Sequence, residues 1–234
     1  MTALVWFRHD LRIQDNPALA NACAEHDEVH AVYLLPQQTF ADAHFWSPRK
    51  ADLLWRHLSE FQADLHAKGI LLKVKVHDTF AESGAIISGV AKEVGAHCVY
   101  FNAEYPVHES KRDGAVRSAL RQHDIDSRVY HGLLLVAPDQ VKTQQGDYYK
   151  VFTPFNKAWR QQLAQQTSWQ PTSVEVRKPV TQDPQPLPEC PLPRIDTSAD
   201  WPVGEQAVLS KFGQFVGHSL QDYQRLRDLP AVGG

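Results

Sequence analysis

The chain has 234 residues, of which 43% are hydrophobic, so it can fold around a core of its own as one large or two small domains. Its formal net charge of -3, from 24 lysines and arginines against 27 aspartates and glutamates, excludes a global attraction to nucleic acid or anionic membranes. Three widely spaced cysteines indicate neither a disulfide framework nor a zinc site, and without a signal segment or a long apolar run we expect a cytoplasmic protein that contacts no membrane.

The first apolar segment, 4–7, leads into a loop of alternating charge. Arg8, Asp10, Arg12 and Asp15 stand where a dinucleotide-binding unit carries glycines that let backbone N–H groups approach a pyrophosphate. The sequence therefore lacks that nucleotide fingerprint. Alternating charges after a buried strand are typical of ion pairs that fix a loop, and we favour that interpretation over a catalytic acid–base cluster.

Five short apolar or β-branched segments predict strands, over residues 4–7, 29–35, 71–76, 98–102 and 127–130. Helical patterns separate them, which is typical of a parallel sheet covered on both faces. We predict an α/β fold with a Rossmann-like, doubly wound, five-stranded parallel sheet and right-handed crossovers.

Helix signals lie between these strands. Asn16-Pro17 and Ser47-Pro48 each place an N-cap residue before a proline at the first helical position. The helix that Ser47 opens is expected to end at Gly69 in the left-handed conformation. Two further helices are predicted over 80–94 and 107–123, giving five βα repeats.

The pattern changes after residue 130. An apolar run over 133–136 is followed by a segment, 149–159, that mixes aromatic residues with lysines. Eight prolines between positions 168 and 202 predict a linker extended enough to cross a whole domain face. Residues 205–227 return to a helical pattern.

Five blocks of sequence carry a specific likeness to a known family. They are Trp6-Phe7-Arg8-x-Asp10-Leu11-Arg12-x-x-Asp15-Asn16-x-Ala18-Leu19, Ser47-Pro48-Arg49, Asn102-x-x-Tyr105-x-x-x-Glu109-x-x-Arg112-Asp113, Tyr149-Lys150-Val151-Phe152-Thr153-Pro154-Phe155-x-x-x-Trp159 and Asp222-Tyr223-x-x-x-Arg227-Asp228-Leu229-Pro230-Ala231-Val232. Together they resemble the DNA photolyase and cryptochrome family over essentially the whole chain. The fourth block favours the bacterial cyclobutane pyrimidine dimer photolyases that use a folate antenna.

The resemblance implies a division of the chain into three parts. Residues 1–135 are expected to form the α/β antenna-chromophore domain, 136–203 an aromatic segment and Pro-rich interdomain linker, and 204–234 the first helix of a helical FAD-binding domain. In the family, that helical domain binds reduced FAD, and the excited flavin passes an electron to a pyrimidine dimer flipped out of DNA.

The resemblance further implies that this chain supplies the antenna of a deoxyribodipyrimidine photolyase and stops before the catalytic part. We therefore expect no DNA repair by the chain alone, with damaged DNA and the helical FAD domain as partners only in a full-length protein. A 5,10-methenyltetrahydrofolate antenna is expected to bind weakly or not at all, because one wall of its cleft would be missing. Exposed apolar surface on the interdomain face is expected to favour association.

The resemblance also assigns site residues. His44, His108 and Glu109 stand where family members contact the pterin, and His108 replaces a more usual asparagine. One carboxylate can accept hydrogen bonds from both the amino group and the ring N–H of a pterin, which suits Glu109. Tyr223 resembles a residue beside the flavin. No catalytic or metal-binding residue is predicted.

Two other interpretations stay open. The chain could be a free-standing module that binds a chromophore such as a folate, a flavin or a nucleotide, or a cryptochrome-like photoreceptor fragment. It could also be a remnant with no activity of its own. For Glu109, the competing interpretation is a residue that only decorates a helix, and for His44 a solvated loop residue. Trp6 and Trp159 are predicted to be core or interface aromatics.

Overall fold

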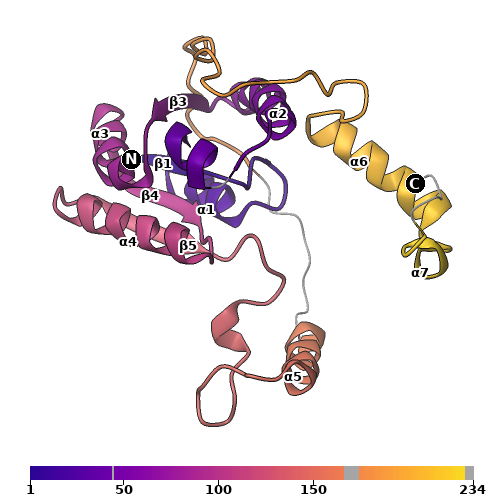
Figure 1. Ribbon diagram of the computed structural model, residues 1–234. Helices are drawn as coiled ribbons and strands as arrows, with labels where there is room; N and C mark the ends of the chain where they lie inside the picture. The colour runs from indigo at the N-terminus through magenta and orange to yellow at the C-terminus, as the bar shows by residue number, and fades with distance from the viewer. Residues whose placement is uncertain (44, 166–173, 230–234) are drawn as a thin grey trace.

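The computed structural model describes residues 1–43, 45–165 and 174–229, and it has a single five-stranded sheet in those ranges. The strands are β1 (Thr2–Phe7), β2 (Glu28–Pro36), β3 (Leu71–His77), β4 (Ala96–Asn102) and β5 (Asp126–Tyr130). All pair in parallel, in the order β3-β2-β1-β4-β5 (Figure 1). The predicted α/β class and all five strands are confirmed.

The side chains of the central strand point alternately to the two faces of the sheet, and apolar side chains on both sides explain why both faces are covered by helices. In β1, Val5 and Phe7 belong to a core shared with α1 (Pro17–Glu25) and α2 (Pro48–Ala67), while Leu4 and Trp6 belong to a core shared with α3 (Ser83–Glu93) and α4 (Val107–Arg121). Successive side chains of a strand point to opposite faces, so both sets become buried. Trp6 is thereby confirmed as a core residue.

The helix boundaries follow local capping chemistry. Asn16 accepts a hydrogen bond from the backbone N–H of Leu19 at 3.2 Å, and Ser47 accepts one from that of Lys50 at 3.3 Å. Gly69, just beyond α2, adopts the expected left-handed conformation with φ 75°. The predicted 80–94 helix begins as a 3₁₀ turn, Phe80–Glu82, and continues as α3.

Two predictions about helices need correction. The sheet is built from four βα units followed by β5 rather than from five βα repeats, because the chain leaves β5 as a loop instead of packing a fifth helix on the sheet. The segment 149–159, for which no helix was predicted, contributes to α5 (Phe152–Gln165). Pro154 is compatible with that helix because it is the third residue, where its missing N–H would have no intrahelical partner.

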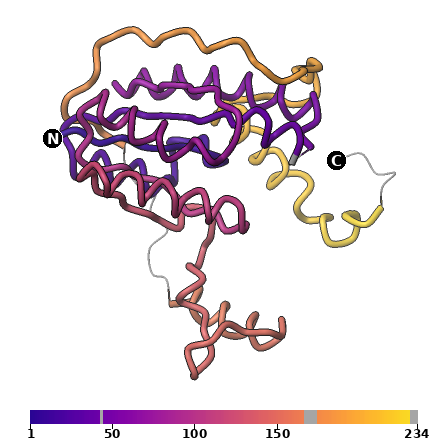
Figure 2. Tube along the Cα trace, turned by 60° about the vertical axis from the view of Figure 1, so that its left-hand side comes forward, coloured from indigo at the N-terminus to yellow at the C-terminus, as the bar shows by residue number. Residues whose placement is uncertain are grey.

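The C-terminal helical pattern is interrupted. It forms α6 (Glu205–Gln214), a π-helical turn Phe215–Ser219 and the four-residue α7 (Tyr223–Leu226). Both α5 and α6–α7 extend away from the sheet (Figures 1 and 2). None of the described helices combines the length and hydropathy needed to cross a bilayer.

The described part of the proline-rich segment, residues 174–203, is an extended strap packed on the α/β domain. Figure 2 shows it arching along the side of the sheet that carries α2. Backbone bonds of 2.8 Å join Lys178 N to Asp27 O and Val180 N to Gly69 O. Val174 and Leu192 are buried in the same core as α1 and α2. The extended conformation was predicted from the prolines, whereas the packing was not.

A buried polar cluster fastens the far end of the strap to α2. The carboxylate of Asp52 accepts hydrogen bonds from Thr197 N at 3.1 Å, Thr197 Oγ1 at 2.9 Å and Arg56 Nε at 2.8 Å. These bonds, led by that from Arg56, hold the pKa of Asp52 below its ordinary value. Arg56 also donates to the carbonyl of Trp201 at 3.0 Å, so the strap has a fixed end point beside α6.

Candidate functional site

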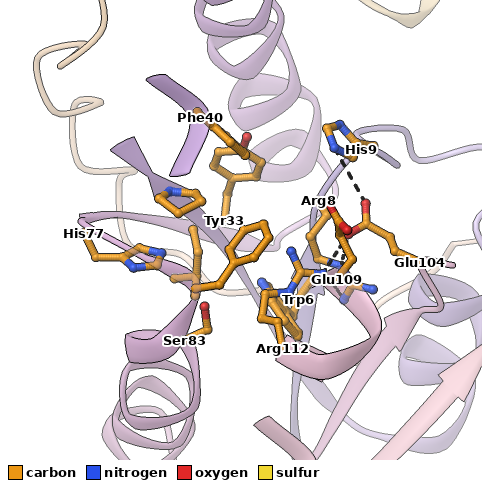
Figure 3. A pocket seen from close by; sticks show the side chains of 13 residues that line it. Trp6, Arg8, His9, Tyr33, Phe40, His77, Ser83, Glu104, Glu109 and Arg112 are labelled. Atoms are coloured by element: carbon orange, nitrogen blue, oxygen red, sulfur yellow. Dashed lines mark hydrogen bonds and ion pairs between the residues drawn. The ribbon is translucent and has the colours of Figure 1, made fainter. Parts of the chain in front are cut away.

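Charged side chains gather where the parallel strands end, which is the edge at which open α/β sheets bind ligands. Arg8 follows β1, Glu104 follows β4, and Arg112 lies in α4 (Figure 3). Glu104 lies 2.7 Å from Arg112 and 3.8 Å from Arg8, and Arg8 lies 3.5 Å from Asp113. All four residues are less than 9% exposed.

The opening loop is held by ion pairs and hydrogen bonds, as predicted, but most of its partners lie elsewhere in the chain. Arg8 pairs with Glu104 and Asp113 and donates to the carbonyl of Asn102, while its backbone N–H donates to Asp10 at 2.8 Å. The carboxylate of Asp10 accepts from the Asn102 amide at 2.7 Å. Arg12 and Asp15 form an ion pair within the loop, at 3.8 Å.

Within this cluster, burial and the neighbouring charges act in opposite directions on the pKa values of Glu104 and Arg8. Burial acts to raise the pKa of Glu104, but the guanidinium groups of Arg8 and Arg112 outweigh it, so the pKa lies below its ordinary value. Burial lowers the pKa of Arg8, against the opposing effect of Asp113 and Asp10. Both guanidiniums also lie over the Trp6 ring, at 4.2 Å and 4.8 Å. Arg8, Glu104 and Arg112 of this cluster also line a small cavity.

Glu109 lies at the edge of this cluster. It occupies the first turn of α4, is 6% exposed, and lines a small cavity with Trp6, His9, Tyr33 and other residues (Figure 3). The space inside is about 10 Å³, which is room for a single water molecule. A pterin ring is far larger, so Glu109 could receive one only at the cavity mouth or after side chains move.

A larger space opens beside the cavity and shares Arg8 and His9 with it. This open groove has a volume of about 360 Å³ and is lined by aromatic and apolar residues together with Lys50 and His57. Trp46 is stacked on Phe40 with ring centroids 4.0 Å apart. The Lys50 ammonium lies over the Trp46 ring, 4.0 Å from the ring centre. Burial lowers the pKa of Lys50. Flat rings and a cation suit an aromatic ligand that bears a carboxylate.

The structure separates the predicted site residues. Glu109 lines the cavity, whereas its neighbour His108 is exposed. His44 lies outside the described residues. Tyr223 is 49% exposed and meets only the ring of Phe215 among its described aromatic neighbours, edge-on at 5.8 Å. It lines neither the cavity nor the open groove.

Trp159, predicted to be a core or interface aromatic, is half-buried. It lines an apolar groove of about 460 Å³ with the run Leu133–Leu135 and residues near α5. The groove therefore gives this tryptophan a surface position rather than one in the sheet's cores.

Sequence reasoning missed Glu104. Its only signal was a carboxylate two residues after a predicted strand, at the edge where parallel strands end. Arg112 was recognised as part of a motif, but no spacing rule connects it with Arg8, which is 104 positions earlier. Lys50 and Trp46 were also missed, because both read as ordinary residues around the start of a helix.

Comparisons with known proteins give a consistent picture. A family profile described as DNA photolyase matches residues 3–178. The chain is 36% identical to a deoxyribodipyrimidine photo-lyase of Escherichia coli K12 over 100% of the chain and 49% of the relative. It is 33% identical to one of Vibrio cholerae, over 99% of the chain and 50% of the relative.

Solved structures agree with the sequence relatives. A class III photolyase from Agrobacterium tumefaciens aligns with a TM-score of 0.74 at 28% identity, covering 99% of this chain and 48% of its own. A cryptochrome from Synechocystis sp. PCC6803 aligns at 0.77 and 23% identity over 97% of this chain and 48% of its own, which shows a shared fold. The chain spans about half the length of the curated relatives it matches. The family match over residues 3–178 shows that this chain belongs to the DNA photolyase family.

Proposed function

We propose that this chain is the antenna-binding part of a deoxyribodipyrimidine photolyase and holds a folate-type chromophore, 5,10-methenyltetrahydrofolate, beside the carboxyl ends of β1 and β4. The observation that carries the proposal is Glu109, a buried carboxylate that lines a small cavity together with Arg8, Glu104 and Arg112 of the charge cluster. In this proposal Glu109 accepts hydrogen bonds from the pterin. His44 and His108 are proposed to contact the same ring.

The groove supports a surface position for the chromophore. The cavity admits one water, while the open groove next to it has about 360 Å³ and carries Trp46 and Lys50. A pterin at Glu109 would therefore lie at the boundary of the two spaces, partly exposed. When bound, the chromophore would absorb near-ultraviolet light and pass the energy on.

We propose that repair of pyrimidine dimers requires an FAD-binding helical part in addition to residues 1–234. Tyr223 is proposed to be one residue of that flavin site, and the domain boundaries at 135/136 and 203/204 are part of the same proposal. Damaged DNA is a partner only in that context. Dimer splitting by the 234-residue chain with added reduced FAD under near-ultraviolet light would contradict this division.

The test of the antenna site is a titration of the purified chain with 5,10-methenyltetrahydrofolate, followed by absorbance and fluorescence. Glu109→Gln should weaken binding by about 10- to 100-fold, because a charge-assisted hydrogen bond contributes roughly 1.5–3 kcal/mol. Glu189→Gln, at an exposed position on the strap, is the matched control and should bind like the unmodified chain. Equal affinity of the Glu109 and Glu189 variants would exclude the proposed pterin contact, and preference for a flavin or a nucleotide would favour the free-standing module.

A further inference from the structure

The start of α6 is held to the loop after β1 by a single carboxylate. Glu205 Oε2 accepts a hydrogen bond from the backbone N–H of Ile13 at 3.0 Å, and Oε1 accepts one from that of Gln14 at 2.9 Å. These partners are more than 190 positions apart in the sequence. Two consecutive N–H groups that meet both oxygens of one carboxylate form a charge-assisted, geometrically specific contact.

His57 of α2 makes a second connection at the same place. Its Nε2 lies 2.8 Å from the carbonyl oxygen of Leu11, so it must donate, and its Nδ1 accepts from the backbone N–H of Gly204 at 3.2 Å. Both bonds together require neutral histidine with its proton on Nε2. Gly204 has φ 88°, a conformation that favours glycine immediately before the helix.

Apolar packing does not account for where α6 lies. The helix has no buried residue, and Val208, Leu209 and Phe212 are between 44% and 61% exposed. Val208 contributes to the open groove, but most of its surface remains in water. The polar contacts of residues 204 and 205 are therefore the specific connections between this helix and the loop after β1.

We propose that Gly204 and Glu205 on one side, and Leu11, Ile13, Gln14 and His57 on the other, form a latch that positions α6 relative to the sheet. Glu205 and His57 are its positioning residues. Leu11, the first residue of the latch, follows Arg8 by three positions and His9 by two, and these two residues line both the cavity and the open groove. The latch therefore connects the orientation of α6 with the wall of the candidate site. This inference goes beyond the antenna proposal and does not depend on any chromophore.

A simpler role for Glu205 makes a different prediction. A glutamate in the first turn of a helix stabilises that helix through its partial positive charge, without reaching another element. With such a role alone, the hydrogen-exchange rates of the Ile13 and Gln14 amides would not change when residue 205 is substituted. With the latch, both rates depend on Glu205.

The experiment is hydrogen exchange of the 234-residue chain, measured by NMR for the amides of Ile13 and Gln14. Glu205→Gln should accelerate exchange at both amides by about tenfold or more, because the variant loses the charge that both bonds use. It should also increase proteolytic cleavage within 204–229, while amides of β1 and β4 keep their protection. Gln206→Ala, an exposed change in the same helical turn, is the control and should leave Ile13 and Gln14 unchanged.

Unchanged exchange at Ile13 and Gln14 in Glu205→Gln would overturn the latch, even if α6 itself became less stable. If that variant loses protection throughout β1 and β4, Glu205→Asp is tested in its place. Its carboxylate reaches one methylene less far towards the two amides, so it should give the same local acceleration. His57→Phe keeps a flat ring but lacks both the donor for Leu11 and the acceptor for Gly204, so it should increase cleavage within 204–229. Cleavage equal to that of the unmodified chain would also contradict the latch.

Discussion

At the scale of single residues, the charged loop after β1 shows what spacing can and cannot predict. Alternating charges at Arg8, Asp10, Arg12 and Asp15 predicted a loop fixed by ion pairs, and that interpretation is confirmed for its general character. The ion-pair partners of Arg8, however, are Asp113 at 3.5 Å and Glu104 at 3.8 Å, and no local pattern connects either carboxylate with it. Because all three side chains are buried, these pairs constrain the candidate site more than exposed pairs could.

Glu104→Gln should therefore destabilise the fold by about 3–5 kcal/mol, because it removes one partner from a buried ion cluster and leaves the guanidinium groups of Arg8 and Arg112 less compensated. Urea unfolding at neutral pH measures the change. Glu189→Gln is the exposed control, expected within about 0.5 kcal/mol of the unmodified chain. A loss of less than about 1 kcal/mol would mean that the cluster contributes little to stability.

The same residue gives a prediction about pH. The folded-state pKa of Glu104 lies below its ordinary value of 4.5, so its contribution to stability is complete above that value and is lost as the pH falls through the folded-state pKa. The difference in unfolding free energy between the unmodified chain and Glu104→Gln should stay constant from about pH 7 to about pH 5 and shrink as the pH falls from there to about 3.5. A difference that stays constant over this range would contradict the assigned direction.

At the scale of elements, the ends of α2 and α3 compare two glycines with the same backbone requirement. Gly69 and Gly95 have φ values of 75° and 65°. A Cβ atom on Gly69 would lie 2.4 Å from that of Pro179 in the strap, whereas one on Gly95 would meet nothing within 4 Å. Both glycines are therefore required by the left-handed backbone, but only Gly69 is also required because the strap leaves no space for a side chain there.

Alanine at each position separates the two requirements. Gly95→Ala should cost about 1–2 kcal/mol from the left-handed backbone alone. Gly69→Ala should cost a further 1–3 kcal/mol or so, because overpacking forces the strap to move. Chemical denaturation of both variants gives the difference between their losses in unfolding free energy, which measures how tightly the strap packs against Gly69. Equal losses would show that the strap moves aside freely.

At the scale of the whole molecule, exposed apolar side chains gather in two regions of the described chain, besides single ones elsewhere. One is the groove formed by Leu133–Leu135 and residues near α5, and the other runs along α6 and the turns after it, where Phe212 and Leu220 are 61% and 48% exposed. Patches of this kind favour contact with another surface. The sequence-based expectation of exposed apolar surface in this chain agrees with these observations.

We expect the purified chain to associate as its concentration rises. Sedimentation velocity over a concentration series measures this, and Phe212→Glu should shift the distribution towards monomer because it places a charge in the apolar surface of α6. Ile195→Glu, on the strap and 55% exposed, is the matched control for adding a charge elsewhere. A monodisperse monomer at all concentrations would contradict the expected association.

The sequence by itself determined the five strands, the capped starts of α1 and α2, and the family, because periodicity, caps and motif spacing depend on residues close together in the chain. It also identified Glu109 as a candidate ligand of a pterin, which remains a prediction. Only the tertiary structure decided that Glu104 joins Arg8 to Arg112, that the strap packs against α2 through Asp52 and Thr197, and that Glu205 reaches the loop after β1. Most of these contacts join residues about 90 to 190 positions apart, and α5 and α6 lie outside the sheet whose alternating pattern made the rest of the fold predictable.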